Sequence, residues 1–294
     1  MDHKKRNNRN RRPQQDGEKR SNRPPRREPR RKIQYRPRPP KDPLPEPPNP
    51  NVRLNRYIAN AGICSRREAD DLIANGMVEV NGEVVKEMGF RVKPEDEVRY
   101  KGKVLMREKP IYVLLNKPKN VITTTDDPRG RQTVLDLVED AGKERIYPVG
   151  RLDRNTTGLL LLTNDGDLAE RLTHPSYGVP KIYRVELDKP INGDHFEEIQ
   201  NGIELEDGKI KPDAIALVSP DAKVIGIEIH SGRNRIVRRI FEHFGYQVEK
   251  LDRTVYANLS KGSLRRGSWR FLKEKEVIAL KVSIGKKKPK PKGK

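Results

Sequence analysis

Apolar residues in the first folded part of the chain, residues 51–100, recur at helical spacing and predict two short helices. The first helix has its apolar face at Val52, Leu54, Tyr57, Ile58 and Ala61. Gly62 follows this face and ends the helix. The second helix begins at a capping box, in which Ser65 is the N-cap and Glu68 lies three residues on, and it ends at Gly76.

The pattern then changes to the alternation typical of strands. Residues 78–80 and 83–85 alternate on either side of Asn81-Gly82, a pair typical of a two-residue hairpin turn. Residues 92–100 suggest one more strand and turn. The sequence therefore predicts a small helix–helix–hairpin module over 51–100, followed by a linker over 101–108.

Strands dominate the predicted larger domain, residues 109–285. The strand candidates are 111–115, 158–163, 181–187, 214–218, 224–230 and 277–284. The helix candidates are 167–172, 194–201 and 234–244. These elements do not alternate regularly, so we predict an α+β domain with a mainly antiparallel sheet. The apolar run 159–162 reads as a buried strand that anchors the loop before it.

Charge divides the chain differently. The sequence carries 63 Lys and Arg against 42 Asp and Glu, a net charge of +21. Residues 1–50 hold 17 basic against 6 acidic residues and 12 of the 24 prolines, and residues 286–294 hold six lysines and no acid. With so few apolar residues, we predict that 1–50 is disordered. Such basic tails bind a polyanion by releasing its counterions, or else serve only solubility.

Cysteine and histidine usage gives no sign of a cofactor. Cys64 is the single cysteine and the five histidines are scattered, so no disulfide within the chain and no zinc site are expected. Neither a phosphate-binding loop nor a G-x-G-x-x-G motif after a strand is present. No secretory signal is visible and no apolar run is long enough to cross a membrane, so we expect a cytoplasmic protein.

One acidic residue stands out, in the segment Gly150-Arg151-Leu152-Asp153-Arg154-Asn155-Thr156-Thr157-Gly158 that precedes the apolar run. Asp153 lies between two arginines in a loop anchored by a buried strand. A rigidly held carboxylate acts as a nucleophile or a base at a sugar carbon. The alternative is that Asp153 is a turn residue that holds the loop by hydrogen bonds.

This segment resembles the catalytic loop of RNA pseudouridine synthases of the RsuA/RluB type. The resemblance extends over residues 52–284 and includes four further segments in the family's order: Asn116-Lys117-Pro118, the basic loop Asp127-Pro128-Arg129-Gly130-Arg131, Lys181-Ile182-Tyr183 and Gly232-Arg233-Asn234-Arg235-Ile236-Val237-Arg238. It implies that Asp153 attacks the target nucleotide, that Tyr183 stacks on the base and that Arg238 pairs with the aspartate. Tyr183 could instead be a packed strand aromatic, and Arg238 could lie on the solvent face of a helix.

Residues 52–100 resemble an S4 RNA-binding domain, whose arginines would face phosphates at the helix starts. The alternative is a solvated basic face. Across both domains the basic residues expected to contact RNA are Arg53, Arg56, Arg66, Arg67, Lys117, Arg129, Arg131, Arg151, Arg154, Lys181, Arg233 and Arg235.

Two positions depart from the family pattern. Ile236 replaces a glutamine, and Ala257 follows Tyr256 where family members often have glycine. The first change concerns local hydrogen bonding and the second the backbone conformation.

Taken together, the sequence predicts an enzyme that isomerises uridine to pseudouridine in ribosomal RNA, free or in a pre-ribosomal particle. The resemblance to the RluB branch favours the large subunit, and small-subunit rRNA and transfer RNA are the alternatives. The resemblance implies no cofactor or metal, and the absence of heptads favours a monomer. A non-enzymatic RNA-binding or ribosome-assembly factor with a degenerate synthase fold is the second hypothesis. Such a copy should have lost Asp153, Tyr183 or Arg238, and all three are present.

Overall fold

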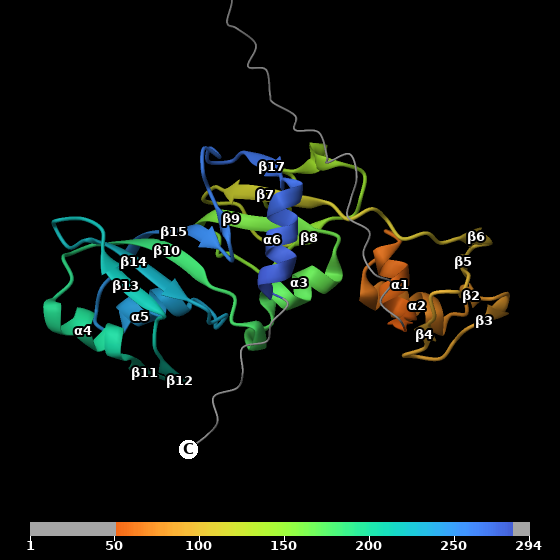
Figure 1. Ribbon diagram of the computed structural model, residues 1–294, viewed down its shortest axis with the longest axis horizontal. Helices are drawn as coiled ribbons and strands as arrows, with labels where there is room; N and C mark the ends of the chain where they lie inside the picture. The colour runs from red at the N-terminus through yellow and green to blue at the C-terminus, as the bar shows by residue number, and fades with distance from the viewer. Residues whose placement is uncertain (1–50, 285–294) are drawn as a thin grey trace, which may run out of the picture. The chain divides into compact units, whose positions relative to one another are not determined.

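The computed structural model describes residues 51–284 (Figure 1). The predicted disordered segment 1–50 and the lysine-rich tail 286–294 lie outside the described residues.

The N-terminal module begins with two helices. α1 spans Leu54–Asn60 and α2 spans Arg66–Ala74. The predicted capping box is present, because the Glu68 amide donates to Ser65 Oγ at 3.2 Å and the Ser65 amide donates to Glu68 Oε2 at 2.6 Å. A cap of this kind stabilises a helix by about 1 kcal/mol.

Short strands complete the module. The four-stranded sheet has the order β3-β2-β5-β6, formed by β2 (Val78–Val80), β3 (Glu83–Val84), β5 (Val98–Tyr100) and β6 (Lys103–Val104). A separate pair joins β1 (Val52–Arg53) to β4 (Arg91–Val92). Asn81 and Gly82 have φ of +53° and +84°, the left-handed turn that their sequence predicts. The structure differs from the predicted linker 101–108, since β6 pairs with β5 and Leu105 packs in the module's core.

The larger domain is built on a nine-stranded sheet. Its main path runs β13-β14-β10-β15-β9-β7-β17, with β16 paired to β15 and β8 paired to β9. The strands are β7 (Tyr112–Lys117), β8 (Tyr147–Pro148), β9 (Thr157–Thr163), β10 (Lys181–Leu187), β13 (Ala214–Leu217), β14 (Val224–Ile229), β15 (Val248–Tyr256), β16 (Leu259–Ser260) and β17 (Trp269–Phe271). Among these pairings only β9–β15 is parallel, so the predicted α+β domain with a mainly antiparallel sheet is confirmed.

Helices and a separate hairpin connect these strands. The helices are α3 (Gly166–Thr173), α4 (Gly193–Asn201), α5 (Ile236–Glu242) and α6 (Glu274–Ile284), with single 3₁₀ turns η1 (Glu139–Ala141) and η2 (Pro175–Tyr177). The hairpin pairs β11 (Ile203–Leu205) with β12 (Gly208–Ile210).

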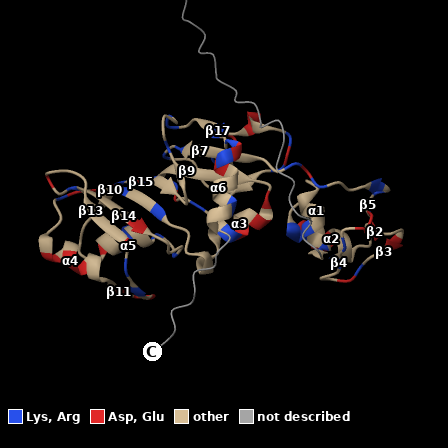
Figure 2. Ribbon diagram, viewed as in Figure 1, with Lys and Arg blue, Asp and Glu red and all other residues tan. Residues whose placement is uncertain are grey.

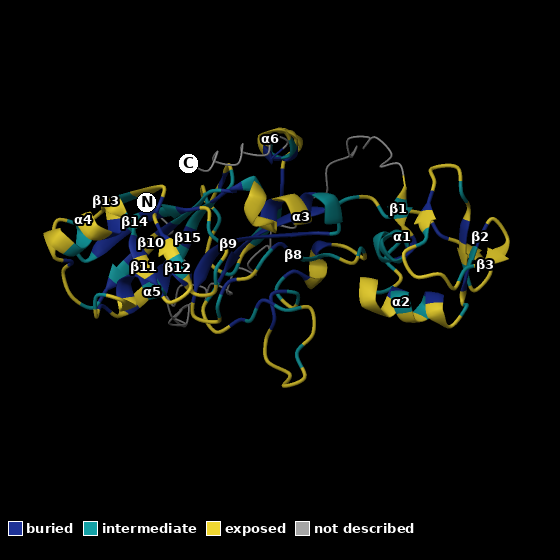
Figure 3. Ribbon diagram, turned by 90° about the horizontal axis from the view of Figure 1, so that it is seen from below, coloured by how far each residue is buried: buried dark blue, intermediate teal, exposed yellow. Residues whose placement is uncertain are grey.

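Strand β9 is buried along its whole length (Figure 3) because its leucines pack alternately into two cores. Leu160 and Leu162 join the core formed with α4 and α5, whereas Leu159 and Leu161 join the core formed with α3 and α6. Each fully buried leucine contributes about 2 kcal/mol. This double burial confirms the interpretation of the apolar run and fixes the strand that follows Asp153.

One predicted strand, 277–284, is wrong: these residues form most of helix α6. Its β-branched residues favour a strand locally, but Val277, Leu280 and Ile284 recur at helical spacing and are all buried on one face. Glu274 and Glu276 lie in the first turn, where negative charge favours a helix. The tertiary packing of one helical face therefore overrides local propensity.

Candidate active site

The loop that carries Asp153 is held on both sides. Pro148 ends strand β8 before the loop, and Thr157 begins strand β9 after it. Thr123 exchanges two hydrogen bonds with the main chain of Leu152, its hydroxyl donating to the carbonyl at 2.9 Å and accepting from the amide at 3.3 Å. Within the loop, the Thr156 amide donates to the Asp153 carbonyl at 3.0 Å. The half-buried Asp153 side chain thus extends from a backbone fixed at several points.

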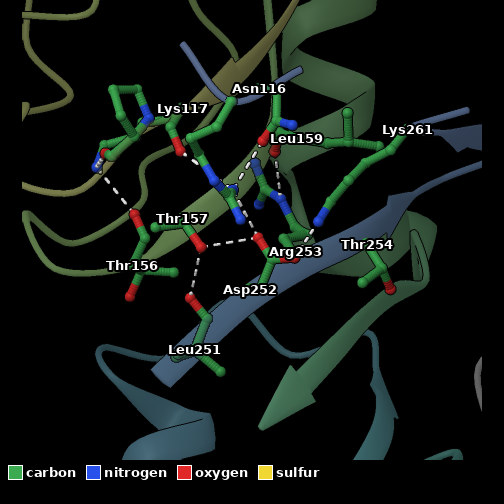
Figure 4. A network of polar contacts seen from close by, with 12 residues as sticks. Asn116, Lys117, Thr156, Thr157, Leu159, Leu251, Asp252, Arg253, Thr254 and Lys261 are labelled. Atoms are coloured by element: carbon green, nitrogen blue, oxygen red, sulfur yellow. Dashed lines mark hydrogen bonds and ion pairs between the residues drawn. The ribbon is translucent and has the colours of Figure 1, made fainter. Parts of the chain in front are cut away.

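Lys117, at the end of β7, lies inside this loop (Figure 4). Its side chain is fully buried, and its ammonium donates to the carbonyl oxygens of Thr156 at 2.9 Å, Asp153 at 3.1 Å, Pro118 at 3.1 Å and Arg154 at 3.3 Å. Burial lowers the pKa of Lys117 to about 8, and the negative charge of Asp153 opposes that shift. The lysine expected to contact RNA is therefore an internal cation that ties the loop together.

Arg238 lies on α5 and is also buried. Its Nη1 donates to the carbonyl of Val248 at 2.7 Å. Burial, followed by the charge of Arg235, lowers the pKa of Arg238, and the charge of Asp153 again opposes the shift. Within residues 51–284 no nitrogen of Arg238 lies within 4 Å of an Asp153 carboxylate oxygen, so the direct ion pair that the resemblance implies is not formed; the two charges interact over a longer distance.

A cleft of about 530 Å³ opens beside this loop. Asp153 lines it together with Tyr183 from β10, whose ring is 9% exposed. Residues from the neighbouring strand and the late loop complete the lining, among them Leu251, Arg253, Tyr256, Arg233 and Arg235. The volume lies within the range of small-ligand pockets, about 300–1,000 Å³. A carboxylate, an aromatic face and basic groups therefore meet in one cleft of nucleotide size.

Arg233 is engaged within the protein. Its guanidinium donates to the carbonyls of Gly208 at 2.8 Å and Lys209 at 3.2 Å in the β11–β12 hairpin. Asp207 at the hairpin turn binds Arg239 through two contacts of 2.7 and 2.8 Å. The hairpin is thereby fixed to the arginine-rich loop beside the cleft, and Arg233 both lines the cleft and supports its wall.

The other basic residues expected to contact RNA lie at or near the surface, where Lys and Arg are spread over both parts of the described chain (Figure 2). Arg56 and Lys181 are partly buried, whereas the exposed set is Arg53, Arg66, Arg67, Arg129, Arg131, Arg151, Arg154 and Arg235. Arg131 is paired with Asp127 at 2.7 Å, which lowers the pKa of that carboxyl to about 2. Their contacts with RNA stay a prediction.

Both departures from the family pattern have a structural outcome. Ile236 is 5% exposed and packs in the core with α5, so an apolar residue suits the position. Ala257 has φ of +53°, in the left-handed region that glycine tolerates best. The backbone conformation expected of a glycine is therefore kept by alanine.

Sequence reasoning missed two charged residues of β15. Arg253 is 3% exposed and lines the cleft. Asp252 accepts from Thr157 at 2.7 Å and from Arg266 at 2.8 Å, and also pairs with Lys261 (Figure 4). No element was predicted over 248–256, and the only available signal was an aspartate and an arginine between apolar residues, a pattern typical of a surface segment.

Residues 51–284 contain neither a cluster of metal ligands nor a membrane-spanning helix. Between residues 51 and 284, no group of three or more His, Cys, Asp and Glu side chains could hold a metal ion. Over the same residues, no helix has the length and apolar character to span a bilayer.

Comparison with known proteins identifies relatives of both parts. Residues 111–243 match the family model described as RNA pseudouridylate synthase, and residues 52–98 match the S4 domain. The ribosomal large subunit pseudouridine synthase B of Bacillus subtilis is 44% identical over 234 residues, 78% of this chain and 96% of that protein. The dual-specificity RNA pseudouridine synthase RluF of Escherichia coli is 37% identical over 254 residues, 84% of this chain and 86% of that protein.

A solved structure agrees with these relatives. The crystal structure of a pseudouridylate synthase superposes with a TM-score of 0.56 and 31% identity, and the match covers 78% of this chain and 99% of the other. The similarity therefore extends over the S4-like module and the larger domain rather than over one motif.

Proposed function

The chain belongs to the RNA pseudouridylate synthase family and is a pseudouridine synthase acting on RNA, and we propose that it isomerises a uridine of large-subunit ribosomal RNA with Asp153 as the nucleophile. One observation carries the assignment of Asp153. Asp153 lines a nucleotide-sized cleft together with Tyr183, on a loop whose backbone is bound by the buried Lys117. A fixed carboxylate is suited to attack at a single carbon atom.

The proposed reaction conserves every atom of the nucleotide except one exchanged proton. An Asp153 oxygen forms a bond to C1′ as the N1–C1′ bond breaks, and the uracil leaves with the electron pair. The ring turns while held in the cleft, and C5 forms a bond to C1′ as the bond to Asp153 breaks. The C5 proton is then lost to solvent and N1 takes up a proton. The target must leave its stack to enter the cleft.

Three side chains have proposed supporting roles. Tyr183 stacks on the uracil, since a tyrosine offers an aromatic face. Arg238 and Lys117 supply positive charge near the Asp153 side chain. Lys117 positions the loop through main-chain carbonyls and does not touch RNA, because its side chain is fully buried.

Large-subunit rRNA is the substrate favoured by the relatives. The Bacillus subtilis protein is named for the large ribosomal subunit, and an S4 domain precedes the synthase domain in this chain. We expect the enzyme to act as a monomer in the cytoplasm, on free rRNA or on a pre-ribosomal particle.

Release of tritium from rRNA containing 5-tritiated uridine tests the proposal. The wild-type chain should release tritium in proportion to pseudouridine formed, and Asp153→Asn should release none above background, with an unchanged thermal unfolding midpoint. Asn155→Ala, an exposed residue of the same loop, is the matched control and should stay active. Equal release by wild type and Asp153→Asn would contradict the role of Asp153. A pseudouridine map of rRNA from a deletion strain identifies the uridine, and a loss confined to the small subunit would contradict the substrate.

A further inference from the structure

Arg253 is a buried cation that the proposed chemistry does not use. Its Nε donates to the Leu159 carbonyl at 2.7 Å (Figure 4). Its guanidinium carbon lies 4.4 Å from the centroid of the Tyr256 ring. These contacts fix the plane of the guanidinium. Nη2 is buried and has no hydrogen-bond partner. A buried donor without an acceptor costs about 1–3 kcal/mol, so the site favours a ligand that supplies one.

A second cation lies beside it. Lys181 is opposite Tyr256 on the neighbouring strand, and its Nζ donates to the carbonyls of Val179 at 3.2 Å and His230 at 3.1 Å. An ammonium has three N–H groups, so one remains for a ligand. Burial, followed by the charge of Arg253, lowers the pKa of Lys181 to about 8. The two positive charges therefore repel one another within one wall of the cleft.

No acidic side chain of the described chain neutralises this pair directly. Asp213, the acid whose charge reaches Lys181, is bound to His230 Nδ1 at 2.7 and 2.9 Å. Asp153 instead interacts with Lys117 and Arg238. The cleft thus has two separate electrostatic zones, one around the nucleophile and one with two cations and an unpaired donor.

Resting on the proposed function, we propose that Arg253 and Lys181 form a subsite for one phosphate of the target strand, adjacent to the nucleotide that Asp153 attacks. A phosphate offers the negative charge that two neighbouring cations require and oxygen acceptors for the free N–H groups. A uracil carbonyl would satisfy a donor but would leave the repulsion between the two cations. The 5′ and 3′ phosphates of a nucleotide are both attached to the sugar that carries C1′. A phosphate bound by Arg253 and Lys181 would therefore lie in the same cleft as the carbon that Asp153 attacks.

The test uses single-turnover pseudouridine formation by the full-length chain on a stem-loop with the mapped target uridine. RNAs with a neutral methylphosphonate at the 5′ or the 3′ phosphate of that uridine report which phosphate is bound. We expect one substitution to raise the half-saturating protein concentration about tenfold, the size expected for one lost charge-assisted contact. Arg253→Met should raise it similarly on unmodified RNA, with the maximal rate less affected.

Combining the Arg253→Met variant with the methylphosphonate RNA tests whether the two changes remove the same contact. If Arg253 binds that phosphate, Arg253→Met should show no further loss on the methylphosphonate RNA, and Arg253→Lys should restore part of the discrimination. Lys181→Gln should behave in the same way and serves if Arg253→Met does not fold, as judged from its unfolding midpoint. Lys250→Gln, an exposed residue of the same strand, is the control and should discriminate like wild type.

Each remaining outcome counts against a particular claim. Multiplicative losses in the double substitution, or equal binding of all three RNAs by wild type, would overturn the subsite while leaving pseudouridine formation intact. Failure of the wild type to form pseudouridine in the unmodified RNA would overturn the proposed function itself.

Discussion

The ammonium of Lys117 lies 3.1 Å from the main-chain carbonyl oxygen of Asp153, so the residue that carries the proposed nucleophile is bound through its backbone by a buried charge. Three further carbonyls share the same ammonium. A cation held in this way fixes the loop while leaving the carboxylate free for substrate.

Replacing Lys117 by methionine should therefore disorder the loop without removing any group that touches RNA. We expect the maximal rate of pseudouridine formation to fall at least tenfold with little change in half-saturation, and stability to fall by about 3 kcal/mol because four buried carbonyls lose their donor. Urea unfolding and single-turnover kinetics measure the two effects. Lys119→Met, an exposed lysine two residues on, should change neither. A Lys117→Met variant as fast as wild type would show that the contacts of Lys117 with the loop carbonyls do not position Asp153.

Activity and stability should change in opposite directions as the pH rises above about 8. Lys117 loses its proton there, which removes positive charge near Asp153, so the maximal rate should fall. The unfolded lysine has a pKa of 10.5 and binds more protons than the folded one between these values, so Lys117 should raise stability with pH by up to about 1.4 kcal/mol per unit, and Lys181, whose pKa is also lowered to about 8, should add to this rise. Rates and urea midpoints between pH 7 and 9.5 measure both. Because Lys181→Arg keeps its charge, the fall in maximal rate should persist in that variant.

Gly158 permits the close approach of β9 and β15. Its φ is +109°, and an added Cβ would lie 2.3 Å from the Arg253 carbonyl oxygen. We expect Gly158→Ala to cost at least about 3 kcal/mol, because the clash is with backbone that has no alternative position. Gly193→Ala, where a Cβ would meet no atom within 4 Å, is the control and should be nearly neutral. Thermal unfolding of the two variants provides the comparison, and equal midpoints would show that the strands can separate at little cost.

Replacing Ala257 by glycine should increase the stability of the protein. Its φ of +53° costs an L-residue about 1 kcal/mol, which exceeds the added chain entropy of glycine only modestly. We expect Ala257→Gly to raise stability by about 0.5 kcal/mol with activity unchanged, measured by urea unfolding and tritium release. Ala216→Gly, in a strand, should instead lower stability. A less stable Ala257→Gly would indicate that the methyl group packs favourably.

The sequence predicted those parts whose local signals agree with their packing. Ser65 and Glu68 specify a helix start by themselves, and the leucines of β9 specify a strand because both sheet faces are covered. Strand β15 was missed because Asp252 and Arg253 interrupt its apolar pattern. In the structure Asp252 accepts hydrogen bonds from Thr157 and Arg266, and Arg253 donates to the Leu159 carbonyl. Thr157 and Leu159 lie 95 and 94 residues away from their partners in the chain, and no local pattern reveals them.

The candidate site was predictable only in outline. Motif order indicated Asp153, Tyr183 and Arg238, and the structure places the first two in one cleft. The role of Lys117 could not be anticipated, because the local sequence does not distinguish a lysine that faces solvent from one that binds four carbonyls. Its burial depends on how β7 and β9 are paired.

In the described chain, the strand pairing between β9 and β15 consists of two residue pairs, Thr157 with Asp252 and Gly158 with Arg253, and forms a short seam between the two halves of the sheet. A ligand seated against Arg253 and Asp153 would bridge this seam. By linkage, a ligand that binds across the seam must stabilise the pairing of β9 with β15, and a stable pairing must strengthen binding of the ligand. Amide hydrogens along the seam should then exchange more slowly when RNA is bound, so that the substrate itself completes the rigidity of the sheet that holds it.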